Sequence, residues 1–411
     1  MGSGPVSGSE PGLPGSVLLP ERTSRNAAGA VLCVANFASD TGYAWRLMER
    51  LWARLAHDAS AAGARTFVAF PRLNGISDTI RHAPLDAVEL AVPGAAAPAR
   101  RQLREFIRDN RVRLVYLTDR EYWSPFYASL RRWGVCSIVL HDHIPGERPP
   151  QPSWRLLAKR MRHRAPGCSA DLYIGVSDFV RERFTHVAGV PAQRCVTLRN
   201  GVAPAAGAVR DVRELFRLPA DAQVVVSSSR ATWYKGIDFL IRCAARLVHG
   251  ERRSRVHFLH FGDGPDMATF RAEVGRLGLD GRFILAGRQH DVPSLLGSCT
   301  LAAHASHGEA FSLAILEFMA AGLPSVVPAH CGNGEAVVHS EHGALYPPGD
   351  LDAAVAWIGR LLDDEPMRRR LAEQARRRAS EEFSLERMES GFSTLMQPFL
   401  PRASGARRTH G

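Results

Sequence analysis

Two glutamates, Glu309 and Glu317, stand on either side of the predicted start of a buried helix. The residues around Glu317 are apolar in every direction, which favours a buried helix over an amphipathic surface helix. Ser312 is the candidate N-cap of this helix, and Gly322 followed by Pro324 ends it. A helix that begins at Ser312 leaves Glu309 in the preceding loop and places Glu317 little more than one turn inside.

The start of this helix suits an anion. Its free backbone N–H groups and the positive end of its dipole attract phosphate-like groups. Because Glu309 and Glu317 flank that end, their carboxylates could accept hydrogen bonds from hydroxyl groups on both sides of a bound diphosphate, which is the outline of a sugar nucleotide. A buried carboxylate is costly unless it is paired. The residues alone therefore leave a second interpretation open, a core helix whose glutamates pair with arginines.

Two cations follow a predicted strand at 223–226. Arg230 can bond two phosphate oxygens at once, and Lys235 supplies a compact point charge. Lys235 is one of only two lysines in the chain, the other being Lys159, which hints that arginine would not serve at this position. The alternative is a pair of surface cations in a loop.

The composition is that of a globular protein of about two domains. Of the 411 residues, 45% are apolar and 23% are charged, which is ordinary for soluble proteins. No apolar run approaches the roughly 18 residues of a membrane span, and no secretory signal is apparent at the N-terminus. The seven cysteines are scattered and never spaced as C-x2-C. This pattern predicts reduced cytoplasmic thiols, with neither a disulfide framework nor a zinc site.

The formal net charge of +11 is carried almost wholly by arginine. Such a surplus suits anionic membranes or phosphorylated substrates, and it also arises as a compositional habit of a genome. One basic segment, 155–164, surrounds Trp154, Leu156 and Leu157. It is either a solvated basic helix or a contact for an acceptor or a membrane surface. No nucleic-acid partner is expected, because no pattern interleaves aromatic and basic residues as in nucleic-acid-binding modules.

Apolar strands alternate with helical segments along the chain. Strands that read as continuous apolar runs predict an α/β protein whose parallel sheets are covered by helices on both faces. A strand, a polar loop through Gly42 and a helix at about 45–55 form the first unit of a doubly wound sheet. The predicted strands are 30–35, 65–70, 114–117, 137–140, 171–176, 223–226, 256–261, 282–286, 300–303 and 325–327.

Two histidines follow the strand predicted to end at Leu140. Ligands of open α/β sheets gather at the carboxyl ends of strands, so His141 and His143 are candidates for a binding site. The alternative is that these are solvent-facing loop residues.

Several segments resemble one enzyme family. Gly308-Glu309-Ala310-Phe311-Ser312, with Glu317 and then Ala320-Ala321-Gly322-Leu323-Pro324, resembles the E-x7-E segment of the retaining GT4-type glycosyltransferases (glycosyl transferases group 1). Arg230 with Lys235-Gly236 resembles the family's diphosphate-gripping segment, and 196–202 resembles the turn that closes its first domain. The resemblance, from about 30 to 399, implies the GT-B fold, two Rossmann-like doubly wound parallel-sheet domains that face each other across a cleft. It also implies transfer of a sugar from a nucleotide diphosphate sugar with retention at the anomeric carbon.

The resemblance implies roles for single residues. Arg230 and Lys235 would hold the diphosphate, Glu317 the ribose hydroxyls, Glu309 the sugar hydroxyls, and His141 the far side of the sugar. The expected catalytic residues are therefore His141, Arg230, Lys235 and Glu309. The expected donor-binding residues are Gly42, Arg230, Lys235, Arg288, Gly308, Glu309, Ala310, Phe311, Ser312, Leu313 and Glu317.

Other implied features concern the edges of the site. His143 is the second candidate for the histidine of the donor pocket, the loop with Arg288 would pass near the nucleobase, and Gly42 lies in the first loop, near the acceptor. Neither a cofactor nor a metal is implied, and no carboxylate cluster suggests a metal site.

We expect a disordered tail at 1–28, an acceptor-side domain at 29–205, a nucleotide-sugar-binding domain at 206–384, a helix at 385–400 that crosses back to the first domain, and a frayed tail at 401–411. The expected partners are a nucleotide-sugar donor and a glycan, lipid-linked or small-molecule acceptor. The expected location is the cytoplasm, with peripheral contact at the membrane as a further interpretation. Two other functions stay open: a GT-B epimerase or phosphorylase, which the E-x7-E pattern argues against, and a non-enzymatic sugar-nucleotide sensor.

Overall fold

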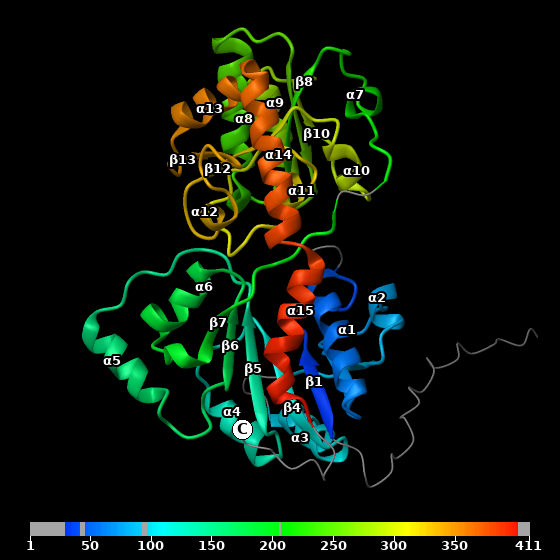
Figure 1. Ribbon diagram of the computed structural model, residues 1–411, viewed down its shortest axis with the longest axis vertical. Helices are drawn as coiled ribbons and strands as arrows, with labels where there is room; N and C mark the ends of the chain where they lie inside the picture. The colour runs from blue at the N-terminus through cyan, green and yellow to red at the C-terminus, as the bar shows by residue number, and fades with distance from the viewer. Residues whose placement is uncertain (1–28, 42–45, 93–96, 205–206, 402–411) are drawn as a thin grey trace, which may run out of the picture.

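The computed structural model describes residues 29–41, 46–92, 97–204 and 207–401, drawn in colour in Figure 1. Outside the described residues lie the predicted tail 1–28, the loop residue Gly42, residues 205–206 at the predicted domain boundary, and residues 402–411.

The first domain is built on a parallel sheet with the strand order β3-β2-β1-β4-β5-β6-β7. The strands β1, β2, β4 and β5 are buried along nearly their whole length, which explains why they read as apolar runs in the sequence. The strands are β1 Ala30–Val34, β2 Arg65–Phe70, β3 Asp86–Glu89, β4 Val112–Thr118, β5 Ser137–Asp142, β6 Leu172–Gly175 and β7 Cys195–Thr197; the helices are α1 Arg46–Ala61, α2 Asp78–Arg81, α3 Ala97–Asp109, α4 Pro125–Arg132, α5 Ser153–Arg162 and α6 Asp178–Arg183.

The second domain repeats this plan with the strand order β10-β9-β8-β11-β12-β13, again parallel. Its strands are β8 Gln223–Ser228, β9 Val256–Phe261, β10 Phe283–Leu285, β11 Leu301–Ala303, β12 Ser325–Pro328 and β13 Gly343–Tyr346; its helices are α7 Val212–Leu215, α8 Ile237–Ala245, α9 Met267–Arg276, α10 Val292–Leu296, α11 Leu313–Ala320, α12 Asn333–Ala336, α13 Leu351–Asp363 and α14 Glu365–Glu382. In each sheet the strand order reverses once, between β1 and β4 and between β8 and β11. Ligands of open α/β sheets bind at such points.

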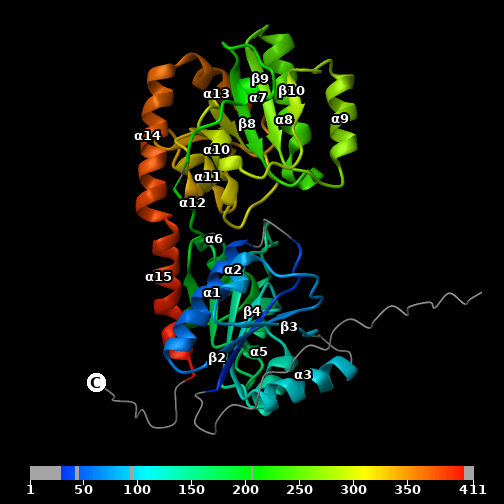
Figure 2. The same cartoon turned by 90° about the vertical axis from the view of Figure 1, so that its right-hand side faces the viewer.

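Two chain segments connect the domains. One follows β7 and passes through Val202, whose N–H donates to the carbonyl of Phe383 at 2.8 Å. The other is the passage from α14 into α15, Leu385–Met396. Figure 2 shows α14 along the second domain and α15 directly below it along the first, on the same side of the molecule. Leu385, Met388 and Phe392 of α15 are buried in the core cluster of the first domain.

The fold confirms the predicted class, two Rossmann-like parallel-sheet domains in the GT-B arrangement. The residue limits of the predicted domains stay predictions. The strands β3, β7 and β13 were missed, as were short helices such as α2. The residues of the edge strand β3 are only half-buried or exposed. Several strand boundaries differ by one or two residues from the predicted ones, as at β4 and β8. The difference that bears on the site is at β5, which continues to Asp142 instead of ending at Leu140. His141 is therefore a strand residue and 1% exposed, not a solvent-facing loop residue.

Candidate active site

The centre of the site is an ion pair between two predicted residues. Lys235 Nζ lies 2.6 Å from Glu309 Oε1, and Nε2 of His304 lies 3.2 Å from the same oxygen. Lys235 ends the short 3-10 turn after β8, whereas His304 directly follows β11, the strand next to β8. Glu309 comes from the loop before α11. Three segments therefore meet at the switch point of the second sheet, where the topology predicts a ligand.

The environment keeps Glu309 ionised. Burial alone would raise the pKa of its carboxyl, but the charge of Lys235 and the hydrogen bond with His304 outweigh that cost and lower the pKa to about 2. Glu309 is therefore a carboxylate at any pH near neutrality. One of its oxygens contacts both Lys235 and His304, so the other can accept a hydrogen bond from a ligand hydroxyl.

The turn that carries Lys235 depends on a glycine. Gly236 has a φ of +67°, and a Cβ at this position would lie 2.1 Å from the carbonyl oxygen of Ala305. Only glycine permits both the left-handed backbone and this close approach to the segment after β11. The Lys-Gly pair recognised in the sequence thus has a geometric reason: Gly236 brings Lys235 alongside the loop that holds Glu309.

Two other predicted cations follow strands of the same sheet, β8 and β10. Arg230 follows the end of β8 and is exposed, in the loop that leads to Lys235. Arg288 is exposed in the loop after β10. The structure thus places Arg230 close to Lys235 along the chain, but it puts Arg288 in a separate loop of the same sheet edge.

Helix α11 begins as predicted, with Ser312 at the N-cap position. The side chain of Ser312 makes no capping hydrogen bond, however, so its expected role as a side-chain cap was wrong. The carbonyl of Phe311 instead accepts a hydrogen bond at 3.0 Å from the amide of Asn200, a residue of the first domain. The N–H groups of the first helical turn have no partner within the helix, as at every helix start. The loop 308–312 thus presents this end of α11 beside the Glu309 centre.

Glu317 is separated from Glu309 by one turn of α11 and opens onto another space. It lines a cavity of about 230 Å³ together with Leu313 of the same helix, Arg46 and Arg50 of α1, and Pro293 of α10. Both domains therefore contribute to the walls of this cavity. The two glutamates lie on either side of the helix start, as the sequence predicted.

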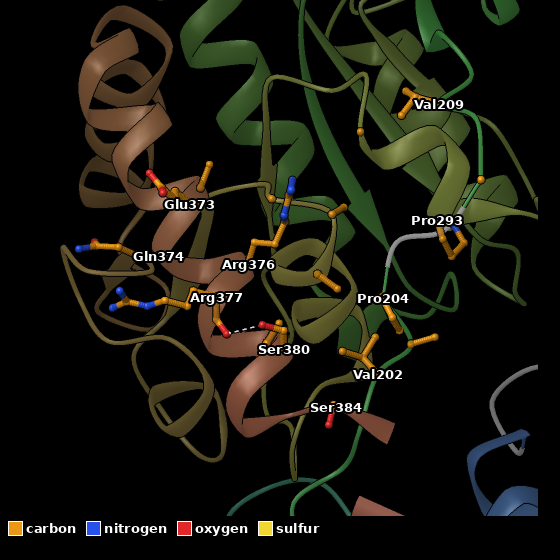
Figure 3. Close-up of a pocket in the computed structure, with 18 of the residues that line it drawn as sticks. Val202, Pro204, Val209, Pro293, Glu373, Gln374, Arg376, Arg377, Ser380 and Ser384 are labelled. Atoms are coloured by element: carbon orange, nitrogen blue, oxygen red, sulfur yellow. Dashed lines mark hydrogen bonds between the residues drawn. The ribbon is translucent and has the colours of Figure 1, made fainter. Parts of the chain in front are cut away.

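A larger cavity of about 1350 Å³ lies on the hinge side of the molecule. In Figure 3 one wall is α14, with Glu373 and Arg376, and the other is the linker with Pro204 and Val209 beside Pro293. None of the residues predicted for the donor site lines this cavity. Because both interdomain connections border it, we interpret it as space beside the hinge and not as the donor site.

His141 and His143 lie together at the end of β5. Nδ1 of His141 is 2.6 Å from the hydroxyl of Tyr116, and the two histidine rings are 4.2 Å apart between centroids. Burial lowers the pKa of His141 well below its usual value, and His143 lowers it further; burial also lowers the pKa of His143 to about 4. Both rings are therefore neutral at pH 7. In the described part of the chain, Nε2 of each ring is buried without a hydrogen-bond partner.

Asp119 is a residue that the sequence analysis missed. It directly follows β4, at the switch point of the first sheet, and has a φ of +54°. Its carboxylate accepts a 2.6 Å hydrogen bond from the N–H of His143. Burial raises the pKa of Asp119 to about 7, and Asp142 adds to this increase against the opposing effects of the His143 bond and Arg183. The strand-end argument that identified His141 would have found Asp119 and His304 as well.

The raised pKa of Asp119 predicts a pH dependence of stability. The folded chain keeps a proton on this carboxyl up to about pH 7, whereas an unfolded aspartate releases it near pH 3.8. Stability should therefore fall as the pH rises between these values. We expect Asp119→Asn, which can still accept the His143 bond, to reduce that fall by on the order of 1–2 kcal/mol after allowance for partial exposure. Urea unfolding of both proteins at pH 5 and pH 8 measures this difference. An equal loss of stability in the parent and in the variant would contradict the prediction.

The domains touch beside the site. Arg183 holds the loop after β5 through the carbonyls of Ile144 and Gly146, at 2.9 and 3.1 Å. A Cβ on Gly308 would lie 3.0 Å from the Cα of Gly146 and 2.7 Å from the hydroxyl of Tyr234. This loop of the first domain therefore packs directly against the loop of the second domain that carries Glu309.

No group of three or more histidine, cysteine, aspartate or glutamate residues that could hold a metal ion occurs among the described residues. The two carboxylates of the site are separated by a helix turn and face different surroundings. The predicted lack of a metal requirement stays a prediction.

Two facing Rossmann-like domains, with a cation–carboxylate centre at the switch point of the second, define the class of GT-B glycosyltransferases. Sequence comparison agrees with this class. The sequence model for Glycosyltransferase Family 4 matches residues 48–206, and that for Glycosyl transferases group 1 matches residues 210–378. The chain belongs to this GT4-type family, which confirms the resemblance seen in its motifs.

Individual relatives agree with the family. The N-acetyl-alpha-D-glucosaminyl L-malate synthase of Bacillus anthracis is 27% identical over 214 residues, 51% of this chain and 55% of that protein. The lipopolysaccharide core biosynthesis glycosyltransferase LpsE of Rhizobium meliloti is 30% identical over 178 residues, 43% of this chain and 51% of that protein. The matched parts thus span about half the length of these curated relatives.

Solved structures show the same fold over a longer stretch. A glycosyltransferase of Rickettsia africae superposes with a TM-score of 0.73 at 16% identity, covering 93% of this chain and 100% of that one. The Anabaena protein HepE, crystallised in complex with UDP, superposes with a TM-score of 0.70 at 20% identity, covering 90% and 100%.

Proposed function

We propose that the protein transfers a sugar, with retention at the anomeric carbon, from a nucleotide diphosphate sugar to a glycan, lipid-linked or small-molecule acceptor. The observation that carries this proposal is the Lys235–Glu309 pair, 2.6 Å apart at the start of α11, with Glu317 one turn further on in a cavity that both domains line. A nucleotide sugar needs cations for its diphosphate and acceptors for the hydroxyls on either side of it. Lys235 would supply such a cation, and Glu309 and Glu317 would supply the acceptors.

Each residue has a part in the proposed reaction. Negative charge builds up on the leaving diphosphate, and cations fixed in place beforehand stabilise it without reorganisation. Lys235 has three N–H donors, so its bond to Glu309 leaves others for phosphate oxygens. Arg230, which is exposed, would donate hydrogen bonds to two phosphate oxygens. Glu309 would hold the sugar hydroxyls, and the neutral His141 or His143 would approach the sugar from the first domain.

The experiment that tests the proposal has two arms. A thermal-shift screen of UDP-, GDP- and ADP-sugars identifies the donor, and incubation of that donor with candidate acceptors identifies the product, whose anomeric configuration is read by NMR. A donor that binds without transfer or hydrolysis would indicate the sensor, and recovery of an epimerised sugar or a sugar phosphate would indicate the epimerase or phosphorylase. Either result would overturn the proposal.

Glu317 gives a sharper test of the ribose contact. We expect Glu317→Gln to raise the KM for the donor about tenfold with a smaller change in kcat, because an amide is a weaker acceptor for two ribose hydroxyls than a carboxylate. Steady-state kinetics over a range of donor concentrations measure this change. A variant that unfolds at lower temperature while its donor KM stays the same would instead assign Glu317 to a structural role.

We also propose that no divalent metal is required. Lys235, Arg230 and the start of α11 supply positive charge where the diphosphate would lie, so an added ion has little charge left to neutralise. Transfer should therefore continue at an unchanged rate in EDTA. Loss of activity in EDTA that Mg²⁺ or Mn²⁺ restores would contradict this assignment.

A further inference from the structure

Helix α5 carries an apolar stripe that faces solvent. Trp154, Leu157 and Met161 have exposed fractions of 67%, 60% and 52%, and no residue of this helix is buried. Their spacing of three and four residues places all three side chains on one face. An amphipathic helix of a globular protein normally turns such a stripe toward the core, whereas α5 turns it outward.

Cations border this stripe on both sides. At the helical angle of about 100° per residue, Arg155 and Arg162 lie along one border and Arg160 along the other. The guanidinium carbon of Arg155 lies 5.1 Å from the centre of the Trp154 ring. A narrow apolar face with tryptophan, rimmed by arginines, is the pattern of a helix that lies in the plane of a membrane interface.

Contacts on the opposite side of α5 hold the apolar stripe outward. Nζ of Lys159 donates to the carbonyl of Val187 at 2.8 Å, and Leu156 on the same side is half-buried. Near the end of the helix, the indole N–H of Trp123 donates to the carbonyl of Arg162 at 2.8 Å. The helix is therefore attached to the first domain by its inner side, and its apolar stripe points away from the protein.

The position of α5 leaves its outer face open. In Figure 1 the helix lies at the outer left edge of the first domain, away from the sheet. Its ten residues measure about 15 Å along the axis, half the thickness of a bilayer core. Among the described residues, no helix is long and apolar enough to cross a membrane. A helix of this kind can lie on a membrane but cannot span it.

We propose that α5 docks the protein onto the surface of an anionic lipid bilayer. Trp154, Leu157 and Met161 would enter the headgroup boundary, and the bordering arginines would contact anionic headgroups. The charge of the rim favours anionic lipid over a neutral surface. The loop 143–152 joins the histidines of the candidate site directly to α5, so docking would bring the acceptor side of the first domain to the bilayer. That consequence, access to a lipid-linked acceptor, rests on the proposed function, whereas the docking itself does not.

The test is cosedimentation with vesicles of phosphatidylcholine, with and without phosphatidylglycerol. We expect the protein to bind only the anionic vesicles, and less at high salt. The variant Trp154→Ser with Leu157→Ser and the variant Arg155→Glu with Arg160→Glu should each bind at least about tenfold more weakly. The control, Arg104→Glu with Arg108→Glu, makes the same charge change on α3 of the same domain, where Leu103 and Ile107 are buried. It should bind anionic vesicles within about twofold of the parent.

Failure to bind anionic vesicles, or an equal loss in the α3 control, would overturn the proposal. So would equal binding to neutral vesicles, because the arginine rim would then have no effect. Circular dichroism confirms that each variant is folded. Donor hydrolysis without vesicles should be the same in all variants, so a failure of the proposed sugar transfer would appear in that assay and not in the vesicle assay.

Discussion

Replacement of Lys235 with alanine is expected to lower both turnover and stability. The variant loses the cation that we propose to contact the leaving diphosphate, which should reduce kcat by on the order of 100-fold. It also leaves the carboxylate of Glu309, only 11% exposed, without its main partner. Loss of one partner from a fully buried pair costs about 3–5 kcal/mol. Because Lys235 is 24% exposed, we expect a loss of about 2 kcal/mol in the free energy of unfolding.

Two further variants separate these effects. Arg230→Ala removes an exposed cation from the same loop, so it should slow turnover while changing stability by less than about 0.5 kcal/mol. The double variant Lys235→Ala with Glu309→Gln removes the buried charge as well. It should regain part of the lost stability without regaining activity. Urea unfolding and steady-state kinetics measure both quantities, and a double variant no more stable than Lys235→Ala would contradict the pairing.

Much of the fold could be predicted because the sheets are parallel and covered on both faces. Strands such as β2 and β9 are mostly apolar and almost wholly buried, and their predicted limits match the structure. The edge strand β3, Asp-Ala-Val-Glu, is short, begins and ends with a charge and is at most half-buried, so no apolar run marked it. The extension of β5 was missed because His141 and Asp142 are polar residues in a fully buried strand.

The sequence indicated Lys235 and Glu309 as candidate site residues, but it did not show that they contact each other. Glu309 and Lys235 were each assigned to a ligand, yet the structure joins them to each other across 74 residues of sequence. The sequence shows that a buried carboxylate needs a partner, but only the packing of β8 beside β11 decides which one. The interpretation that the glutamates pair with arginines was wrong for Glu309, whose partners are Lys235 and His304. The ligand roles themselves stay predictions.

Glu335 joins the two domains, although the sequence analysis gave it no role. It belongs to α12 of the second domain, and its carboxylate accepts hydrogen bonds from the N–H groups of Asp178 and Phe179, at 2.9 and 2.7 Å. These groups begin α6 of the first domain, where a negative charge is favourable. The same carboxylate lies 3.3 Å from Arg199, also of the first domain. One side chain therefore supplies three contacts that exist only while the domains are together.

We expect Glu335→Ala to favour an open arrangement and to slow transfer at least tenfold. Charge-assisted hydrogen bonds contribute about 1.5–3 kcal/mol each, and a loss of on the order of 2 kcal/mol of closing free energy would lower the closed-to-open equilibrium constant about 30-fold. In the proposed reaction transfer would need closure, because the second domain carries Lys235 and Glu309, whereas the first would bring its histidines. Small-angle scattering should show that donor reduces the radius of gyration of the parent protein but much less that of the variant. Glu341→Ala, an exposed glutamate of the same domain, is the control and should behave as the parent. If Glu335→Ala keeps the parent's scattering curve and turnover, Glu335 does not hold the domains together.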